Sequence, residues 1–314
     1  MTPKILLTGA SGLLGLNLSL EAAAAHRVTG VVHRTRLQGT PFPVLQADLT
    51  RPGAVDRLLA ETNPDWVIHT AALANLEDCE RNPALAQRLN SEVPEILAHA
   101  CRKGGARLLH VSTDAVFDGT KGNYSETDTP NPLSVYARTK LAGEQAVAAA
   151  YPQAIVARVN LFGFSPTGRR SLAEFFLYNL LAGKPLKGFT DVFFCPLLVN
   201  TIAEVFIEML EKDLHGLYHV FAAECLSKYD FGVRIARRFG LDASLIAPVS
   251  VQDAGLTARR APNLTMDTHR LSTHLGHPLP AFSPMLERFY TLYQQGYPQV
   301  LKRMAGGRPD VEGA

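Results

Sequence analysis

The amino-acid sequence predicts a doubly wound parallel α/β sheet followed by a smaller, mostly helical C-terminal lobe. Short apolar runs of strand type alternate with helical stretches through about the first 165 residues, which is the pattern of parallel βαβ units. The first apolar run ends in a glycine-rich turn, and the regular alternation stops after Gly163. A chain of 314 residues is long enough for the two lobes that this change of pattern indicates.

The elements of the first lobe follow from its apolar runs, turn residues and helix-start signals. Asn82 and Pro83 resemble a cap followed by a proline at the first helical position, so a helix should begin there. The stretch 134–150 consists mostly of good helix formers. The expected strands are 4–8, 27–33, 44–47, 66–70, 108–112 and 155–160, and the expected helices are 13–25, 54–61, 83–103 and 134–150.

The second lobe has a less regular pattern. A loop at 165–170 precedes an amphipathic helix at 171–182 and an irregular stretch at 184–196. Further helices are expected at 200–212, 227–239 and 284–296. We assign residues 1–165 to the sheet domain, with later segments free to return to it, and residues 166–300 to the second lobe. The polar, glycine-rich residues 301–314 should form a disordered tail.

The composition argues against several classes of protein. Apolar residues make up 46% of the chain and the net charge is +2, whereas nucleic-acid or membrane-surface binding needs a concentrated basic face. We see no signal-peptide pattern, and no apolar run reaches the roughly 18 residues of a membrane span. We therefore expect a cytoplasmic protein that binds neither nucleic acid nor membrane and has no metal site. Its widely spaced cysteines should be reduced thiols: Cys79, Cys101, Cys195 and Cys225.

The glycine-rich turn after the first strand has the context of a dinucleotide-binding fingerprint. Gly9 permits the tight turn, Gly12 lets the backbone approach a diphosphate, and Gly15 allows close packing of helix on strand. The following helix then offers free N–H groups and its positive dipole end to the phosphates. The sequence therefore predicts a Rossmann fold. The residues expected at the dinucleotide are Gly9, Ser11, Gly12, Leu13, Leu14 and Gly15.

The residues after the second strand favour NADP over NAD. An NAD site usually has an acid about 20 residues past the glycines, but no Asp or Glu occurs between Glu21 and Asp48. His33, Arg34 and Arg36 occur there instead, and guanidinium groups suit a 2′-phosphate. Asp48, followed by Leu49, could accept a hydrogen bond from the adenine amino group, or could cap the next helix.

Tyr136 and Lys140 lie four residues apart on the expected helix 134–150, so both side chains share one face. A neighbouring ammonium group favours the phenolate, which predicts a lowered pKa for Tyr136. Such a phenol can donate or accept a proton at a carbonyl or hydroxyl oxygen. Thr113 directly follows the expected fifth strand 108–112 and precedes Tyr136 by 23 residues. A proton donor of this kind, downstream of a turn that can hold a dinucleotide as hydride source, indicates an oxidoreductase.

With these motifs in order, the sequence resembles an extended short-chain dehydrogenase/reductase, and most closely the dTDP-4-dehydrorhamnose reductase family. The segment 112–119, STDAVFDG, is similar to that family's STDYVFDG, with Ala115 in place of tyrosine. The segment 135–144 matches the family's catalytic helix, and 260–267 resembles its RPxxSxLD element, with Ala261 where proline is usual. The resemblance covers about residues 3–298 and is weaker in the second lobe.

The resemblance implies a reductase that uses NADPH to reduce a nucleotide-linked 4-keto-6-deoxy sugar. Tyr136 would donate the proton, Thr113 would hydrogen-bond the same oxygen, and Lys140 would hold the nicotinamide ribose. A homodimer is one assembly that we consider. The resemblance also places Ala71, Ala72 and Asn90 at the cofactor, and Asp114, Asn160 and Arg260 at the substrate, where the arginine would meet a diphosphate.

Two other functions remain open on the sequence. A nucleotide-sugar epimerase or dehydratase would return its hydride and retain NAD, although Ala115 occupies the place where related dehydratases carry a glutamate. The chain also resembles the regulatory β subunit of methionine adenosyltransferase, a non-catalytic protein that binds NADP. Intact Thr113, Tyr136 and Lys140 do not decide between these hypotheses.

Overall fold

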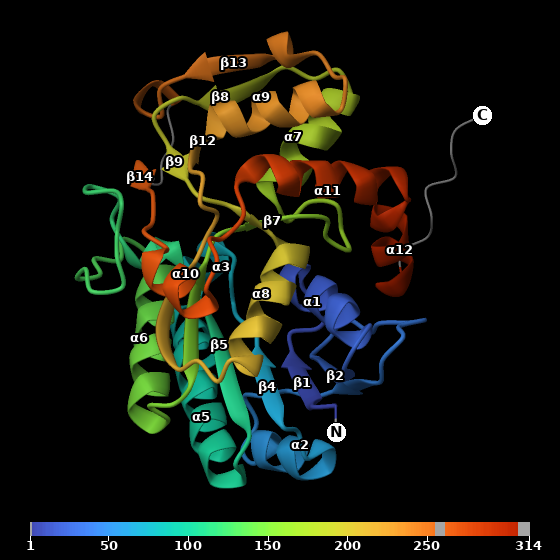
Figure 1. Ribbon diagram of the computed structural model, residues 1–314, viewed down its shortest axis with the longest axis vertical. Coiled ribbons are helices and arrows are strands. Elements are labelled where there is room, and N and C mark those ends of the chain that lie inside the picture. Colours follow the sequence, from blue (N-terminus) through green and yellow to red (C-terminus); the bar gives the residue numbers. More distant parts are fainter. Residues whose placement is uncertain (1, 255–260, 307–314) are drawn as a thin grey trace.

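The computed structural model describes residues 2–254 and 261–306, and its centre is a seven-stranded parallel sheet with the order β11-β6-β5-β4-β1-β2-β3 (Figure 1). This confirms the doubly wound α/β class that the sequence predicts. All neighbours in the sheet pair in parallel, so the carboxyl ends of the strands meet at one edge. The strands are β1 (Lys4–Thr8), β2 (Arg27–Val32), β3 (Val44–Gln46), β4 (Trp66–His69), β5 (Arg107–Thr113), β6 (Ile155–Val159) and β11 (Gly216–Val220).

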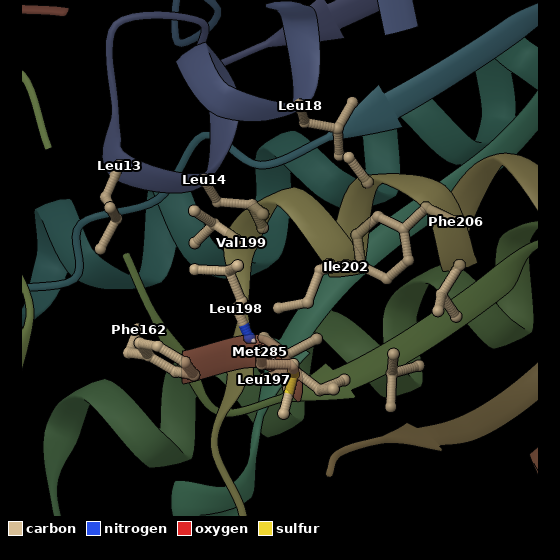
Figure 2. Packing of buried hydrophobic residues seen from close by; sticks show 14 of the residues in the cluster. Leu13, Leu14, Leu18, Phe162, Leu197, Leu198, Val199, Ile202, Phe206 and Met285 are labelled. Carbon is tan, nitrogen blue, oxygen red and sulfur yellow. Dashed lines mark hydrogen bonds between the residues drawn. The ribbon is translucent and has the colours of Figure 1, made fainter. Parts of the chain in front are cut away.

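Helices cover both faces of the sheet because the apolar side chains of each strand alternate between them. Ile5 and Leu7 of β1 belong to one buried cluster, whereas Leu6 between them belongs to the other. On the first face, Leu14 and Leu18 pack near Ile202 and Phe206, as Figure 2 shows. The first face is covered by α1 (Leu13–Ala23) and α8 (Val199–Glu211), and the second by α2 (Ala54–Thr62), α5 (Val93–Gly104) and α6 (Val135–Ala150).

The expected helix 83–103 is interrupted. It consists of α4 (Pro83–Gln87), a π-helical turn η1 (Arg88–Glu92) and α5, and α3 (Leu76–Arg81) precedes it. Asn82 caps α4 by accepting a hydrogen bond from Leu85 N at 3.1 Å, as the sequence predicts. A Cβ on Gly143 of α6 would overlap the Asn90 carbonyl oxygen, so glycine lets α6 pack closely on the π turn.

The second lobe lies above the carboxyl edge of the sheet, at the top of Figure 1. Its helices α7 (Leu172–Leu181), α9 (Lys228–Arg238) and α11 (Phe282–Gln294) enclose a cluster of buried phenylalanines that includes Phe162, Phe231 and Phe289. The remaining helices are α10 (His269–Leu275) and α12 (Tyr297–Met304), with 3-10 turns at Asp114–Val116, Ala243–Leu245 and Gln252–Ala254. Its strands pair as β7 (Leu161–Phe162) with β10 (Leu197–Leu198), β9 (Phe193–Phe194) with β12 (Leu226–Ser227) and β14 (Asn263–Leu264), and β8 (Leu186–Phe189) with β13 (Ile246–Val249).

Two expectations for the second half of the chain, the irregular stretch 184–196 and the tail 301–314, are corrected by the structure. The assignment of 1–165 and 166–300 allowed later segments to return to the sheet domain, and two do so: α8 packs on the sheet and β11 is its seventh strand. The stretch 184–196 contains β8 and β9 and is not irregular. The expected tail 301–314 begins inside α12, and residues 307–314 lie outside the described residues.

The expectation of reduced thiols is wrong for two of the cysteines. Cys195 and Cys225 form a disulfide between the segments that hold β9 and β12, with their Cα atoms 4.1 Å apart. Cys79 and Cys101 are free and buried. In the described ranges, no helix is both long and apolar enough to cross a bilayer.

Candidate active site

The N-terminal turn brings backbone donors to the carboxyl edge of β1. Gly9 has a φ of +77°, a left-handed conformation that favours glycine, and its carbonyl oxygen accepts a hydrogen bond from Gly12 N at 2.9 Å. A Cβ on Gly15 would overlap the Gly9 carbonyl group, so the close packing of α1 requires glycine at position 15. Gly12 is the N-cap of α1 and provides no side-chain cap. The first turn of α1 therefore offers N–H groups and a positive dipole end to an anion.

A cleft of about 550 Å³ runs along the carboxyl edge of the sheet from this turn to Tyr136 and Lys140. Ligands of doubly wound proteins bind at this edge, because the loops after the strands meet there. The structure thus brings the expected cofactor residues and the expected catalytic residues to one cavity. The sequence-predicted residues that line it are Gly9, Ser11, Gly12, Leu13, Leu14, Gly15, His33, Asp48, Leu49, Ala71, Ala72, Thr113, Asp114, Tyr136, Lys140 and Asn160.

Of the three basic residues expected at the cofactor after β2, only His33 lines the cleft. Its Nε2 atom lies 3.8 Å from the Asp48 carboxylate. Asp48 also accepts hydrogen bonds from Thr50 N at 3.0 Å and Thr50 Oγ1 at 2.6 Å, and the hydroxyl bond is the main reason why its pKa is lowered. Arg34 and Arg36 are exposed and do not line the cleft. Their expected place at the cofactor stays a prediction.

The phenol of Tyr136 faces the cleft from the first turn of α6. Ser134 starts this helix, because its Oγ accepts a hydrogen bond from Ala137 N at 3.2 Å. The Tyr136 hydroxyl is hydrogen-bonded to Thr113, whose Oγ1 also accepts from Ala115 N at 3.2 Å. Burial raises the pKa of Tyr136 to about 12, and the Thr113 bond only partly offsets this effect. The predicted lowering of the Tyr136 pKa is therefore wrong.

Lys140 is bound to the floor of the cleft and does not stabilise a phenolate in this structure. Its Nζ donates to the Val111 carbonyl oxygen at 2.7 Å and lies 3.3 Å from His110 Nε2. Burial lowers the pKa of Lys140 to about 8, while the Glu144 carboxylate opposes the shift. The pKa of His110 lies well below its usual value, chiefly because the ring is buried. His110 is therefore a neutral acceptor for the ammonium group.

Asp114 and Asn160 form a polar group beside Thr113. Asn160 Nδ2 donates to Asp114 Oδ2 at 2.6 Å, and Thr113 Oγ1 donates to Asp114 Oδ1 at 3.1 Å. Burial raises the pKa of Asp114, whereas these bonds and the charge of Lys228 oppose the shift. Both side chains line the cleft, so they are placed to meet the hydroxyl groups of a ligand.

Asn90 lies in the π turn near the cleft and does not line it, so its expected place at the cofactor stays a prediction. Its Oδ1 accepts from Leu73 N at 2.9 Å, and its Nδ2 donates to the Leu73 carbonyl at 3.0 Å and to Thr139 Oγ1 at 3.1 Å. It therefore orders the loop after β4, where Ala71 and Ala72 line the cleft, and ties this loop to α6.

The cleft has further lining residues that sequence patterns did not indicate. Most of them lie at the last residues of sheet strands or directly after them. They could therefore have been found from the expected strand boundaries. Arg170 comes from a loop of the second lobe and carried no signal. Arg260 lies outside the described residues. Throughout those residues, no three His, Cys, Asp or Glu side chains are grouped to hold a metal ion. The additional lining residues are Val31, Val32, Ala47, Thr70, Ala74, Leu89, Val111, Ser112, Val159, Leu161 and Arg170.

The parallel order of the sheet, with a glycine turn at its carboxyl edge, defines an α/β protein of the Rossmann type. The chain belongs to a family within this class, the family described as the RmlD substrate binding domain, whose profile matches residues 3–295. The predicted resemblance to dTDP-4-dehydrorhamnose reductases is thereby confirmed.

Individual relatives agree with this family. The chain is 33% identical to the probable low-salt glycan biosynthesis reductase Agl14 of Haloferax volcanii, over 86% of this chain and 91% of that protein. It is 34% identical to the dTDP-4-dehydrorhamnose reductase of Mycobacterium tuberculosis, over 79% of each chain. Methionine adenosyltransferase 2 subunit beta of Danio rerio is 30% identical over 85% of this chain and 84% of that protein. The reductases among these relatives support an NAD(P)-dependent oxidoreductase.

Solved structures show the same fold. A dTDP-4-dehydrorhamnose reductase from Clostridium acetobutylicum superimposes with a TM-score of 0.80 at 28% identity, covering 93% of this chain and 99% of that one. The Bacillus anthracis reductase, solved in complex with NADP, has a TM-score of 0.80 at 24% identity with the same coverage.

Proposed function

We propose that this protein is an NADPH-dependent reductase of the short-chain dehydrogenase/reductase type that acts on a nucleotide-linked 4-keto-6-deoxy sugar. One observation carries the proposal. Tyr136, hydrogen-bonded to Thr113, and Lys140 line the same cleft as the glycine turn. A proton donor and a dinucleotide-binding turn in one cavity suit the reduction of a carbonyl group, and the reductases among the relatives support this reaction.

The residues of the cleft fit a nicotinamide dinucleotide. The turn from Gly9 to Gly15 would hold the diphosphate, His33 and Asp48 the adenosine end, and Lys140 the nicotinamide ribose. When bound, NADPH supplies the hydride for the carbonyl carbon. NADPH should bind more tightly than NADH, because the end of β2 carries His33 and no acid. Equal dissociation constants for NADPH and NADH would contradict this preference.

Tyr136 would supply the proton. Because its pKa is about 12, the phenol is protonated at neutral pH and can donate to the keto oxygen, which becomes the new hydroxyl group. Thr113 lies beside this phenol and can hydrogen-bond the oxygen as negative charge develops on it. The tyrosinate that remains would take up a proton from water before the next turnover, while Lys140 would hold the nicotinamide ribose.

The test measures NADPH oxidation with a dTDP-4-keto-6-deoxy sugar and quantifies the reduced sugar. We expect one NADPH consumed for each sugar reduced. Tyr136→Phe should lower kcat by roughly 100-fold to 10,000-fold without changing NADPH binding. Tyr290→Phe, which removes a phenol hydroxyl on α11, is the matched control. Isomerisation of the sugar without net NADPH loss would instead identify an epimerase.

A second candidate is a cofactor-binding subunit of methionine adenosyltransferase. The 30% identity to the Danio rerio subunit beta, over most of both chains, favours it. In that case NADPH binds, no sugar is reduced, and the purified chain forms a stable complex with a methionine adenosyltransferase catalytic subunit. Absence of this complex by size-exclusion chromatography, together with turnover on the sugar, would exclude the second candidate.

A further inference from the structure

The loop 165–170 at the edge of the cleft is anchored at both ends by one carboxylate. Glu174 of α7 is 1% exposed, and its Oε1 accepts from Ser165 N at 2.6 Å. Its Oε2 accepts from Arg170 N at 2.9 Å and from Ser171 N at 3.2 Å. Ser171 completes a capping box with Glu174. The backbone of Arg170 is therefore held in place, although its side chain is exposed.

Arg170 is one of the residues that line the cleft, whereas its neighbour Arg169 is not. No carboxylate of the described residues pairs with the Arg170 guanidinium. Within those residues, Arg170 forms a hydrogen bond only through its backbone N–H. The two carboxylates that line the cleft in the described part of the chain are already bonded, Asp48 to Thr50 and Asp114 to Asn160. Arg170 thus places a positive charge at the edge of the cavity without a counter-charge from the described residues.

We infer that Arg170 binds a phosphate oxygen of a diphosphate ligand in the cleft. A guanidinium group forms two parallel charge-assisted hydrogen bonds with a phosphate, and a fixed backbone reduces the entropy lost on binding. The inference rests on the proposed function, because both the dinucleotide and a nucleotide-linked sugar carry a diphosphate. The anchored loop assigns the residue a role in binding, not in proton transfer.

Calorimetric titration of Arg170→Gln and Arg169→Gln tests the inference. The ligands are NADPH for the free protein, and dTDP or thymidine for the protein saturated with NADP. Arg170→Gln should weaken either dTDP or NADPH binding by roughly tenfold to a hundredfold, and leave thymidine unchanged. Weaker dTDP binding identifies the substrate diphosphate, and weaker NADPH binding identifies that of the cofactor. Arg170→Lys should recover part of the affinity, because it keeps the charge.

The inference is overturned if Arg170→Gln and Arg169→Gln have the same small effect on both ligands. It also fails if the wild-type protein does not bind dTDP and Arg170→Gln leaves NADPH binding intact. These outcomes can be told apart from a failure of the proposed reaction. An affinity that depends on Arg170, without turnover of the sugar, would contradict only the proposal that the protein is a reductase. Turnover with unchanged affinities would contradict only the role of Arg170.

Discussion

Removing one partner of the buried ion pair between Glu144 and Arg158 should strongly destabilise the protein. Glu144 on α6 accepts from Arg158 Nε at 2.9 Å and from Nη2 at 2.7 Å, and the two side chains are 6% and 3% exposed. Glu144→Gln keeps the volume but leaves the guanidinium buried without a counter-charge, at a cost of about 3–5 kcal/mol. This corresponds to a Tm lowered by roughly 5–8 °C.

Thermal unfolding followed by circular dichroism measures this effect. The double variant Glu144→Leu/Arg158→Met, in which no charge is buried, should lose much less than the single variant or nothing. The matched control is Glu287→Gln, which breaks a surface pair with Arg238 at 2.6 Å and should leave the Tm nearly unchanged. If Glu144→Gln also leaves the Tm unchanged, the pair is not desolvated and the reasoning is refuted.

Three further predictions concern the cofactor turn and the buried titratable groups. Gly15→Ala should abolish NADPH binding because its Cβ overlaps the Gly9 carbonyl, whereas Gly104→Ala, with nothing within 4 Å, should bind normally in the same titration. Because the pKa of Lys140 is lowered to about 8, kcat/KM should fall as pH rises through about 8 and the ammonium is lost, and the more basic side chain of Lys140→Arg should remove this decline. The pKa of His69 is lowered by burial from 6.5 to about 3, so the unfolded chain binds a proton below pH 6.5 that the folded chain does not. The Tm should therefore fall between pH 6.5 and pH 5, and a His69→Asn variant with the same acid sensitivity would contradict this assignment.

The sequence was informative where the site depends on local structure. The glycine turn and the Tyr136–Lys140 spacing each lie within one βα unit or one helix, so residue type and spacing are enough to locate them. The order of strands placed Thr113 and Asp48 at the same edge, because parallel strands end together. The cleft contains all of these residues.

The sequence failed where the outcome depends on contacts between distant segments. Spacing alone placed Lys140 beside Tyr136, but the position of Val111 directs the ammonium to the strand, and burial then raises the Tyr136 pKa. The pairing of Cys195 with Cys225 depends on the antiparallel contact of β9 with β12. Arg170 reaches the cleft only because a carboxylate four residues later fixes its loop. Such contacts have no local signature.

The last strand of the central sheet in sequence order, β11, is synthesised long after its partner β6, which affects how the chain folds. Residues 216–220 complete the sheet by pairing with β6, all five of whose residues are buried. Until they leave the ribosome, β6 is an edge strand with unpaired backbone groups, which favours association with other chains. A fragment that ends near residue 165 should therefore aggregate, and the two halves of the chain should fold as one cooperative unit.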